Sequence, residues 1–302
     1  MTFGGQLDEL ASHRLLDVAF ERGITFFDTA NAYNGGASER ILGAWLKGRR
    51  DRTVVATKVR YQVGTDPWSV GLSRRTVKTE VERSLARLGT DWIDILYLHQ
   101  PDYETGMEET LRAVEDLIRE GKVHVLGVSN FAAWQIVRAH WLAERGGLTP
   151  PLVVQPMYNL LSRRIEQELL PCCREFGLGV FVYNPLAAGL LTGKHNYGAG
   201  PAKGGRFDVL PYYVDRYWTE SLFSAVTRLS VLAASINRSL ISMSLTWLLR
   251  RPDITGIILG ASSLEQLEEN LNAFGDPLPE DALRECDAVW NVLRGASPQY
   301  NR

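Results

Sequence analysis

The sequence predicts an α/β fold, in which parallel strands alternate with helices, and three observations support this. Short runs rich in Val, Ile and Phe recur along all 302 residues and are nearly continuous in hydrophobicity, as buried parallel strands are. Longer amphipathic stretches separate these runs. No linker interrupts the alternation, so we expect a single domain over residues 1–302.

The elements follow in chain order. The expected strands are 24–28, 53–58, 93–99, 123–129, 152–155, 180–183 and 254–259. The expected helices are 8–22, 39–47, 73–88, 107–120, 132–145, 165–176, 217–250 (broken somewhere within it) and 264–274, followed by a C-terminal helix and tail over about 279–302. This order predicts one parallel sheet with helical crossovers.

The segment 73–88 shows how a helix is recognised. One face carries residues at helical spacing, which are Val77, Val81, Ser84, Leu85 and Leu88. We place Lys78, Glu80, Glu82 and Arg83 on the opposite, polar face. Ser73 is expected to cap the start of the helix, and Gly89 is expected to end it.

Two architectures compete for such a chain, an open doubly wound sheet and a closed (β/α)8 TIM barrel. An open dinucleotide-binding sheet carries G-x-G-x-x-G between its first strand and helix, and this chain has no such motif there. Gly177-Leu178-Gly179 precedes a strand and is interpreted as a turn. The barrel is therefore predicted. Because a barrel has eight strands and seven are found, we expect its first strand to be missing ahead of Met1.

Composition excludes several classes of function. A net charge of −2 argues against nucleic-acid binding, and no apolar run approaches the ~20 residues of a membrane span. The three cysteines, Cys172, Cys173 and Cys286, form no C-x-x-C motif, which favours the reducing cytoplasm. Histidines are scattered at positions 13, 99, 124, 140 and 195, so we expect no metal site.

Polar residues end three consecutive strands. Asp28, Lys58 and His99 take these positions, and Tyr33 follows in the loop after the first strand. Each residue alone has an ordinary structural explanation, such as a helix cap or a buried histidine. Active sites of barrels lie where the strands end, so together these four are expected to meet at one mouth.

The four side chains suit the reduction of a carbonyl group. This reaction needs a hydride donor, which no side chain can be, and an acid that protonates the new alkoxide. Tyr33 can supply the proton, and a neighbouring Lys58 ammonium, held by Asp28, would stabilise the phenolate. His99 would hydrogen-bond the carbonyl oxygen and polarise it.

The residues around this site resemble the aldo-keto reductase family. Phe27-Asp28-Thr29-Ala30-Asn31-Ala32-Tyr33-Asn34-Gly35-Gly36-Ala37-Ser38-Glu39 is similar to its signature F-D-T-A-x-x-Y-G-x-G-x-S-E. Matching segments in family order cover essentially the whole chain, at 56–58, 94–99, 127–131, 155–159, 185–194 and 259–270. The opening Thr2-Phe3-Gly4-Gly5-Gln6 places the resemblance closest to the branch that contains the voltage-gated potassium-channel β subunits.

The resemblance implies a barrel that binds NADP(H), with Asp28, Tyr33, Lys58 and His99 as a catalytic tetrad. It implies cofactor contacts at the nicotinamide, the pyrophosphate and the adenosine 2′-phosphate, where a helix N-terminus favours anions. The implied contact residues are Gln6, Asp28, Ser129, Asn130, Gln155, Tyr183, Asn184, Pro185, Leu186, Gly189, Leu191, Lys194, Arg206, Gly260, Ser262, Gln266, Glu269 and Asn270. Asn34 replaces the usual glycine after the tyrosine, and we expect the turn to persist because Asn tolerates a positive φ.

Two functions remain. The first is an NADP(H)-dependent reductase of aldehydes or ketones, and the second is a cofactor-sensing subunit of the channel-β type with little turnover. The loop 192–214, with Gly and Pro clustered at 198–205, is either a cover for the cofactor or a mobile surface loop. The small-molecule carbonyl substrate and a homo-oligomeric state are not determined by the sequence. Aromatic candidates for the rim of the pocket are Tyr61, Trp68, Tyr212, Tyr213, Tyr217, Trp218 and Tyr300.

Overall fold

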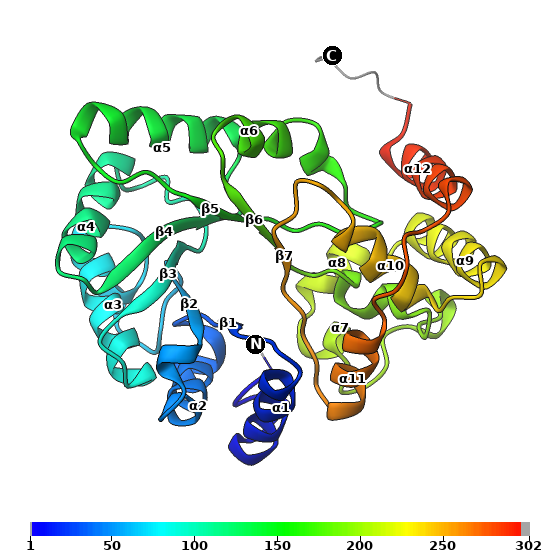
Figure 1. Ribbon diagram of the computed structural model, residues 1–302, viewed down its shortest axis with the longest axis horizontal. Coiled ribbons are helices and arrows are strands. Elements are labelled where there is room, and N and C mark those ends of the chain that lie inside the picture. The colour runs from blue at the N-terminus through cyan, green and yellow to red at the C-terminus, as the bar shows by residue number, and fades with distance from the viewer. Residues whose placement is uncertain (1, 297–302) are drawn as a thin grey trace. The chain divides into compact units, whose positions relative to one another are not determined.

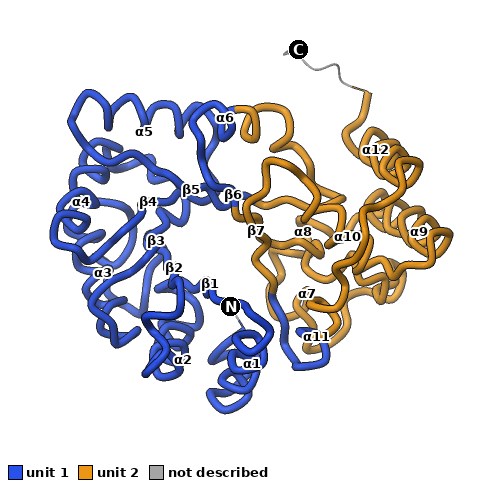
Figure 2. Tube along the Cα trace, in the orientation of Figure 1, with its two compact units in different colours: residues 1–156, 172–180, 260–267 blue, residues 157–171, 181–259, 268–302 orange. Residues whose placement is uncertain are grey.

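The structure of the protein is a computed structural model that describes residues 2–296. The chain divides into two compact units (Figure 2). Unit 1 comprises residues 1–156, 172–180 and 260–267, and unit 2 comprises 157–171, 181–259 and 268–302. The expected single domain over 1–302 stays a prediction. The expected rim residue Tyr300 and the end of the C-terminal tail lie outside the described residues.

Strands in the described part of the chain pair in sequence order, and every pair is parallel (Figure 1). They are β1 (Phe26–Asp28), β2 (Val54–Val59), β3 (Ile93–Leu98), β4 (Val123–Ser129), β5 (Val153–Gln155), β6 (Gly179–Val182) and β7 (Gly256–Ile257). This sequential parallel order, with helices between the strands, confirms the α/β class and the (β/α)8 barrel type. Seven strands are present within residues 2–296, as the sequence predicted.

Helices follow the strands in both units. In unit 1 they are α1 (Glu9–Glu21), α2 (Ala37–Leu46), α3 (Arg74–Leu88), α4 (Met107–Arg119) and α5 (Ala133–Gly146). In unit 2 they are α7 (Arg206–Val209), α8 (Tyr212–Tyr217), α9 (Glu220–Ser235), α10 (Leu240–Leu249) and α12 (Glu280–Arg294). Two others, α6 (Leu169–Glu175) and α11 (Leu264–Asn272), pass from one unit into the other along the chain.

Strand register in unit 1 brings the chemistry-bearing positions to one edge. Lys58 of β2 pairs with Tyr97 of β3, and Tyr97 pairs with Gly127 of β4. Ser129, the last residue of β4, pairs with Gln155, the last residue of β5. Because the strands are parallel and in sequential order, their carboxyl ends share this edge.

Helix α3 confirms its expected caps and corrects one position. The Ser73 hydroxyl accepts a hydrogen bond from the Thr76 amide at 3.2 Å, and Gly89 ends the helix in the left-handed conformation at φ 61°. Glu80, which we expected on the exposed face, is fully buried. It lies at the margin of the apolar stripe, where Asn31 and Arg83 satisfy its carboxylate.

Unit 2 departs from the sequence prediction mainly in its loops. The break expected within 217–250 is confirmed, and it separates α9 from α10 where Asn237 has φ 55° and Ser239 caps the start of α10. The expected helix 165–176 is reduced to α6, preceded by a 3-10 turn over Arg164–Glu166. The long loop 192–214 contains the 3-10 turn Tyr197–Ala199, helix α7 and the start of α8. The last strand, β7, is shorter than expected.

Within residues 2–296, no helix combines the length and apolarity needed to cross a membrane. The same residues contain no cluster of three or more His, Cys, Asp or Glu side chains arranged to hold a metal ion.

Candidate active site

A buried ion pair lies at the carboxyl ends of β1 and β2. The Lys58 ammonium donates to Asp28 Oδ1 and to the Thr29 carbonyl oxygen, the latter at 2.8 Å. The Lys58 side chain is 1% exposed and that of Asp28 is 7% exposed. Gln155 Nε2 donates to the second Asp28 oxygen at 2.7 Å. Both carboxylate oxygens are thus paired, which offsets the desolvation of the two charges.

Tyr33 stands beside this pair. It begins the 3-10 turn Tyr33–Gly36 that follows β1. The Lys58 ammonium nitrogen lies 5.1 Å from the centroid of the Tyr33 ring, and the ring meets that of His99 edge-on at 5.7 Å. The structure therefore brings the four residues of the expected tetrad together within unit 1.

His99 is held as a neutral imidazole. Burial lowers its pKa well below the ordinary 6.5, and the nearby positive charges of Lys58 and Arg60 lower it further. Its Nδ1 is buried and has no hydrogen-bond partner among the described residues. A neutral ring carries one N–H, and a buried N–H without an acceptor is rare, so we assign the proton to Nε2.

The turn after Tyr33 needs left-handed backbone at three consecutive positions. Asn34, Gly35 and Gly36 have φ values of 49°, 61° and 86°. The expectation that Asn34 preserves the turn is confirmed. Asn34 Nδ2 also donates to the Phe3 carbonyl oxygen at 2.7 Å, which ties the N-terminal turn to this loop. Gln6, an expected cofactor contact, is exposed in that same turn.

Three expected nicotinamide contacts gather at the ends of β4 and β5. Ser129 and Gln155 are buried, and the Ser129 hydroxyl donates to the Gln155 carbonyl oxygen at 2.9 Å. Asn130, exposed at φ 61°, donates from Nδ2 to the His99 carbonyl oxygen at 2.9 Å. The Ser129 bond joins the ends of β4 and β5, and the Asn130 bond ties this amide side chain to the backbone of His99.

In unit 2, the expected pyrophosphate loop is built on left-handed residues. Asn184, Ala187 and Ala188 have φ values of 60°, 49° and 59°. Asn184 Oδ1 accepts from the Ala188 amide at 2.6 Å, and its Nδ2 donates to the Tyr217 hydroxyl at 2.9 Å. Tyr217 is buried, so it supports this loop rather than a pocket rim.

The remaining expected contacts lie in three segments. Tyr183, Pro185, Leu186, Gly189, Leu191 and Lys194 belong to unit 2, in or next to the 3-10 turn Ala187–Thr192. Arg206 begins α7, with its guanidinium 5.9 Å from the centroid of the Tyr213 ring. Gly260, Ser262 and Gln266 belong to unit 1, and Glu269 and Asn270 belong to unit 2. The Ser262 hydroxyl donates to Gln266 Oε1 at 2.9 Å.

Tyr97 also lies at this site and was not predicted from the sequence. This residue is fully buried, and its ring centroid lies 5.9 Å from the Lys58 ammonium nitrogen. Burial raises the pKa of its hydroxyl, and the negative charge of Asp28 raises it further, so Tyr97 stays protonated. Strand alternation was the available signal, because Tyr97 and His99 are two residues apart and share a face.

Arg60 was missed as well. It directly follows β2 and has φ 147°, a strained value for a residue with a side chain. Its Nε is buried and has no hydrogen-bond partner within the described part of the chain. A strained conformation has no signature in a single sequence.

The fold and this site together define a class of protein. Parallel β/α units carry a buried lysine–carboxylate pair, a tyrosine and a neutral histidine at the strand ends, and the family match and relatives reported next support an oxidoreductase that reduces carbonyl groups. Residues 1–291 match the Aldo/keto reductase family, and the chain belongs to it. Members of this family generally use NAD(P)H.

The similar proteins include reductases and channel subunits. Aflatoxin B1 aldehyde reductase member 2 of Rattus norvegicus is 38% identical over 321 residues, which cover 100% of this chain and 86% of the relative. Human aldo-keto reductase family 7 member A3 is 38% identical over 322 residues, which cover 100% of this chain and 95% of the relative. A probable voltage-gated potassium channel subunit beta of Arabidopsis thaliana is 35% identical over 285 residues, with 92% and 86% covered. The resemblance inferred from the sequence is confirmed.

Proposed function

We propose that this protein is an NADP(H)-dependent reductase that converts an aldehyde or ketone to an alcohol, with Tyr33 as the proton donor. The observation that carries the proposal is the fully paired, buried Lys58–Asp28 ion pair beside Tyr33. Burying two charges is costly, and such a pair stabilises a fold no better than well-packed apolar residues do. Proton transfer explains why the pair lies next to the Tyr33 phenol, because the Lys58 ammonium would stabilise the phenolate that proton loss leaves.

The donor set fits a reduced nicotinamide. When bound, that group supplies the hydride that adds to the carbonyl carbon. Ser129, Asn130 and Gln155 would hold its carboxamide, since each carries a polar side chain at the strand ends next to the tetrad.

The chain's own residues handle the proton. Tyr33 gives its hydroxyl proton to the carbonyl oxygen as the alkoxide forms, and the Lys58 ammonium stabilises the phenolate that remains. Asp28 keeps Lys58 charged and in place. His99, being neutral, donates from Nε2 to the carbonyl oxygen and orients it without competing for the proton.

The residues for the nucleotide end are proposed from the family resemblance. The loop after β6, from Asn184 to Lys194, would contact the pyrophosphate through its backbone amides. Arg206 would bind the 2′-phosphate, because its planar fork can make two bonds to one phosphate. Gly260, Ser262, Gln266, Glu269 and Asn270 would hold the adenosine ribose.

An aldehyde is the carbonyl that we favour, since one of the relatives described above is named as an aldehyde reductase. A cytoplasmic location is in keeping with the three cysteines, which form no C-x-x-C motif. The second candidate, a cofactor-sensing subunit with little turnover, is favoured by the relative named as a probable channel subunit.

Turnover of the purified protein tests the proposal. An aromatic aldehyde, a small sugar aldehyde, a ketosugar and pyridoxal are each offered with NADPH and with NADH, and cofactor oxidation is matched to alcohol formed. We expect one alcohol per NADPH consumed on at least one aldehyde, and slower reaction with NADH. Tight NADPH binding with no turnover on any carbonyl would contradict the enzyme and support the sensing subunit.

A further inference from the structure

The position of Tyr33 is set by a tight turn. The Tyr33 amide donates to the Ala30 carbonyl oxygen at 3.1 Å, so Asn31 and Ala32 form the corner of a four-residue turn. The Asn31 amide donates to the Lys58 carbonyl oxygen at 3.1 Å. The backbone of this corner is therefore tied to the end of β2.

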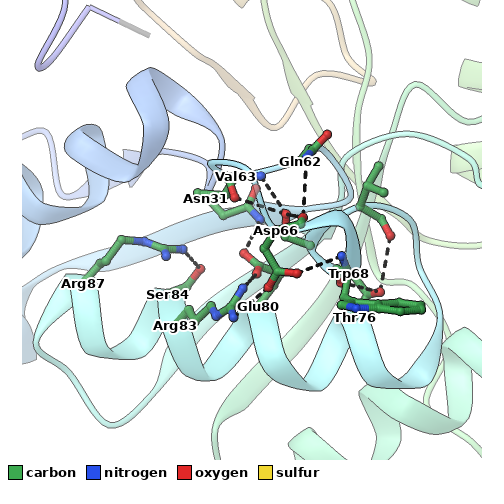
Figure 3. A network of polar contacts seen from close by, with 12 residues as sticks. Asn31, Gln62, Val63, Asp66, Trp68, Thr76, Glu80, Arg83, Ser84 and Arg87 are labelled. Atoms are coloured by element: carbon green, nitrogen blue, oxygen red, sulfur yellow. Dashed lines mark hydrogen bonds and ion pairs between the residues drawn. The ribbon is translucent and has the colours of Figure 1, made fainter.

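The side chain at the corner is anchored to a helix. Asn31 is fully buried, and its Nδ2 donates to Glu80 Oε2 at 3.0 Å. Glu80, on α3, is itself fully buried and accepts from Arg83 at its other oxygen, at 2.8 Å. Figure 3 shows these three side chains converging from the turn and from the helix.

The same contacts continue into the loop that follows β2. Arg83 donates to Asp66 at 2.9 Å, and Asp66 also accepts from the Trp68 amide at 2.9 Å (Figure 3). This loop begins with Tyr61, whose ring lies 4.8 Å from that of His99. The polar contacts of α3 thus hold two segments, the turn before Tyr33 and the loop after β2. These segments carry the Tyr33 and Tyr61 rings that lie next to His99.

We propose that Asn31 and Glu80 are positioning residues that hold the turn and thereby place Tyr33 for proton transfer. The inference rests on the proposed role of Tyr33 as the acid. A buried carboxylate and amide contribute little net stability compared with apolar side chains of the same shape. What they add is a defined geometry. A hydrogen bond requires a particular distance and angle, so it fixes the corner of the turn more closely than apolar contact does.

The test removes the anchor and measures chemistry separately from binding. In Asn31→Ala we expect kcat to fall by roughly 10- to 10²-fold, as small displacements of a reacting group do. The KM for the carbonyl and the affinity for NADPH should change by less than about twofold, because neither contact is removed. Rates are expressed per NADPH-binding site, so that loss of folded protein does not count as loss of kcat.

Matched variants separate positioning from stability. Glu80→Gln keeps an acceptor for Asn31 and should retain most of kcat, whereas Glu80→Ala should reproduce the loss. Lys78→Met removes ion pairs to Asp116 and Glu120 from the same helix and should leave kcat unchanged. If Asn31→Ala does not fold, Asn31→Ser, which leaves a smaller void and does not reach Glu80, takes its place.

A double variant gives the decisive result. If Asn31 acts through Tyr33, adding Asn31→Ala to Tyr33→Phe should cause no further loss of kcat. The positioning role would be overturned if the kcat losses of the two single variants multiply in the double variant. It would also be overturned if Asn31→Ala keeps the wild-type kcat. Failure of the proposed function is distinguishable, because Tyr33→Phe alone would then keep normal turnover.

Discussion

The strand ends of unit 1 and the loop after β6 in unit 2 place their functional residues by different means. In unit 1, Asp28 and Lys58 stand on paired strands, and their charges are buried and matched. In unit 2, Asn184 and Ala188 adopt left-handed backbone outside any strand, held by a side-chain-to-backbone bond of Asn184. The difference suits the two tasks proposed above, proton transfer at the strand ends and phosphate binding at the loop. Proton transfer needs a fixed geometry within fractions of an ångström, whereas phosphate binding uses backbone amides that loops present.

The largest expected effect is on the ion pair of the strand-end region. Lys58→Met should lower turnover by roughly 10²–10⁴-fold, because the phenolate of Tyr33 loses its stabilising charge. It should also destabilise the protein by about 3–5 kcal/mol, since Asp28 is left as a buried charge without its cation. Turnover and denaturant unfolding measure the two effects.

The control for Lys58→Met is an ion pair at the surface. Arg74→Met removes a bond to Asp116 between side chains that are 49% and 32% exposed, and should cost about 0–1 kcal/mol without loss of turnover. Equal destabilisation by the two variants would show that the Lys58 pair is not effectively buried.

In unit 2, the largest expected effect is on the preference for NADPH over NADH. Arg206→Ala should weaken NADPH binding by roughly tenfold to a hundredfold, the worth of charged hydrogen bonds to a phosphate, and should affect NADH far less. Fluorescence titration with both cofactors measures this, with Lys203→Ala, an exposed cation nearby, as the control. Equal losses for NADPH and NADH would show that Arg206 does not bind the 2′-phosphate.

The smallest effect compares equivalent glycines in the two units. A Cβ at Gly127 would lie 2.6 Å from the Tyr97 ring, and one at Gly256 would lie 2.8 Å from the Phe181 ring. Gly127→Ala should destabilise by about 1–3 kcal/mol, because Tyr97 is fully buried and has no room to move. Gly256→Ala should cost less, since Phe181 is only partly buried.

Activity distinguishes these two glycine variants further. Gly127→Ala pushes Tyr97 toward Lys58 and should lower turnover several-fold, by roughly 1 kcal/mol or less of transition-state stabilisation. Gly256→Ala should not change turnover. Equal turnover in the two variants would show that the position of the Tyr97 ring does not affect the function of Lys58.

Features carried by strands were predictable from the sequence. The bounds of β4 match the expected 123–129, and the four tetrad residues meet as expected because parallel strands share one edge for their carboxyl ends. The caps of α3 were predictable because a Ser hydroxyl accepts from free amides at the start of a helix, and because Gly readily adopts the left-handed conformation at its end.

Features that depend on partners distant in sequence were not predictable. Glu80 has the charge of a surface residue, and its burial depends on Asn31, 49 positions away, together with Arg83. The short helices in 192–214 depend on tertiary packing, which local propensity does not record.

The most direct test of the account is the loss of one oxygen atom, in Tyr33→Phe. NADPH binding, followed by fluorescence quenching, is measured beside single-turnover reduction of an aldehyde that the wild type reduces. The account predicts unchanged NADPH affinity, reduction slower by roughly 10²–10⁴-fold, and loss of the high-pH limb of the rate profile. Normal single-turnover reduction by Tyr33→Phe would contradict the assignment of Tyr33 as the proton donor.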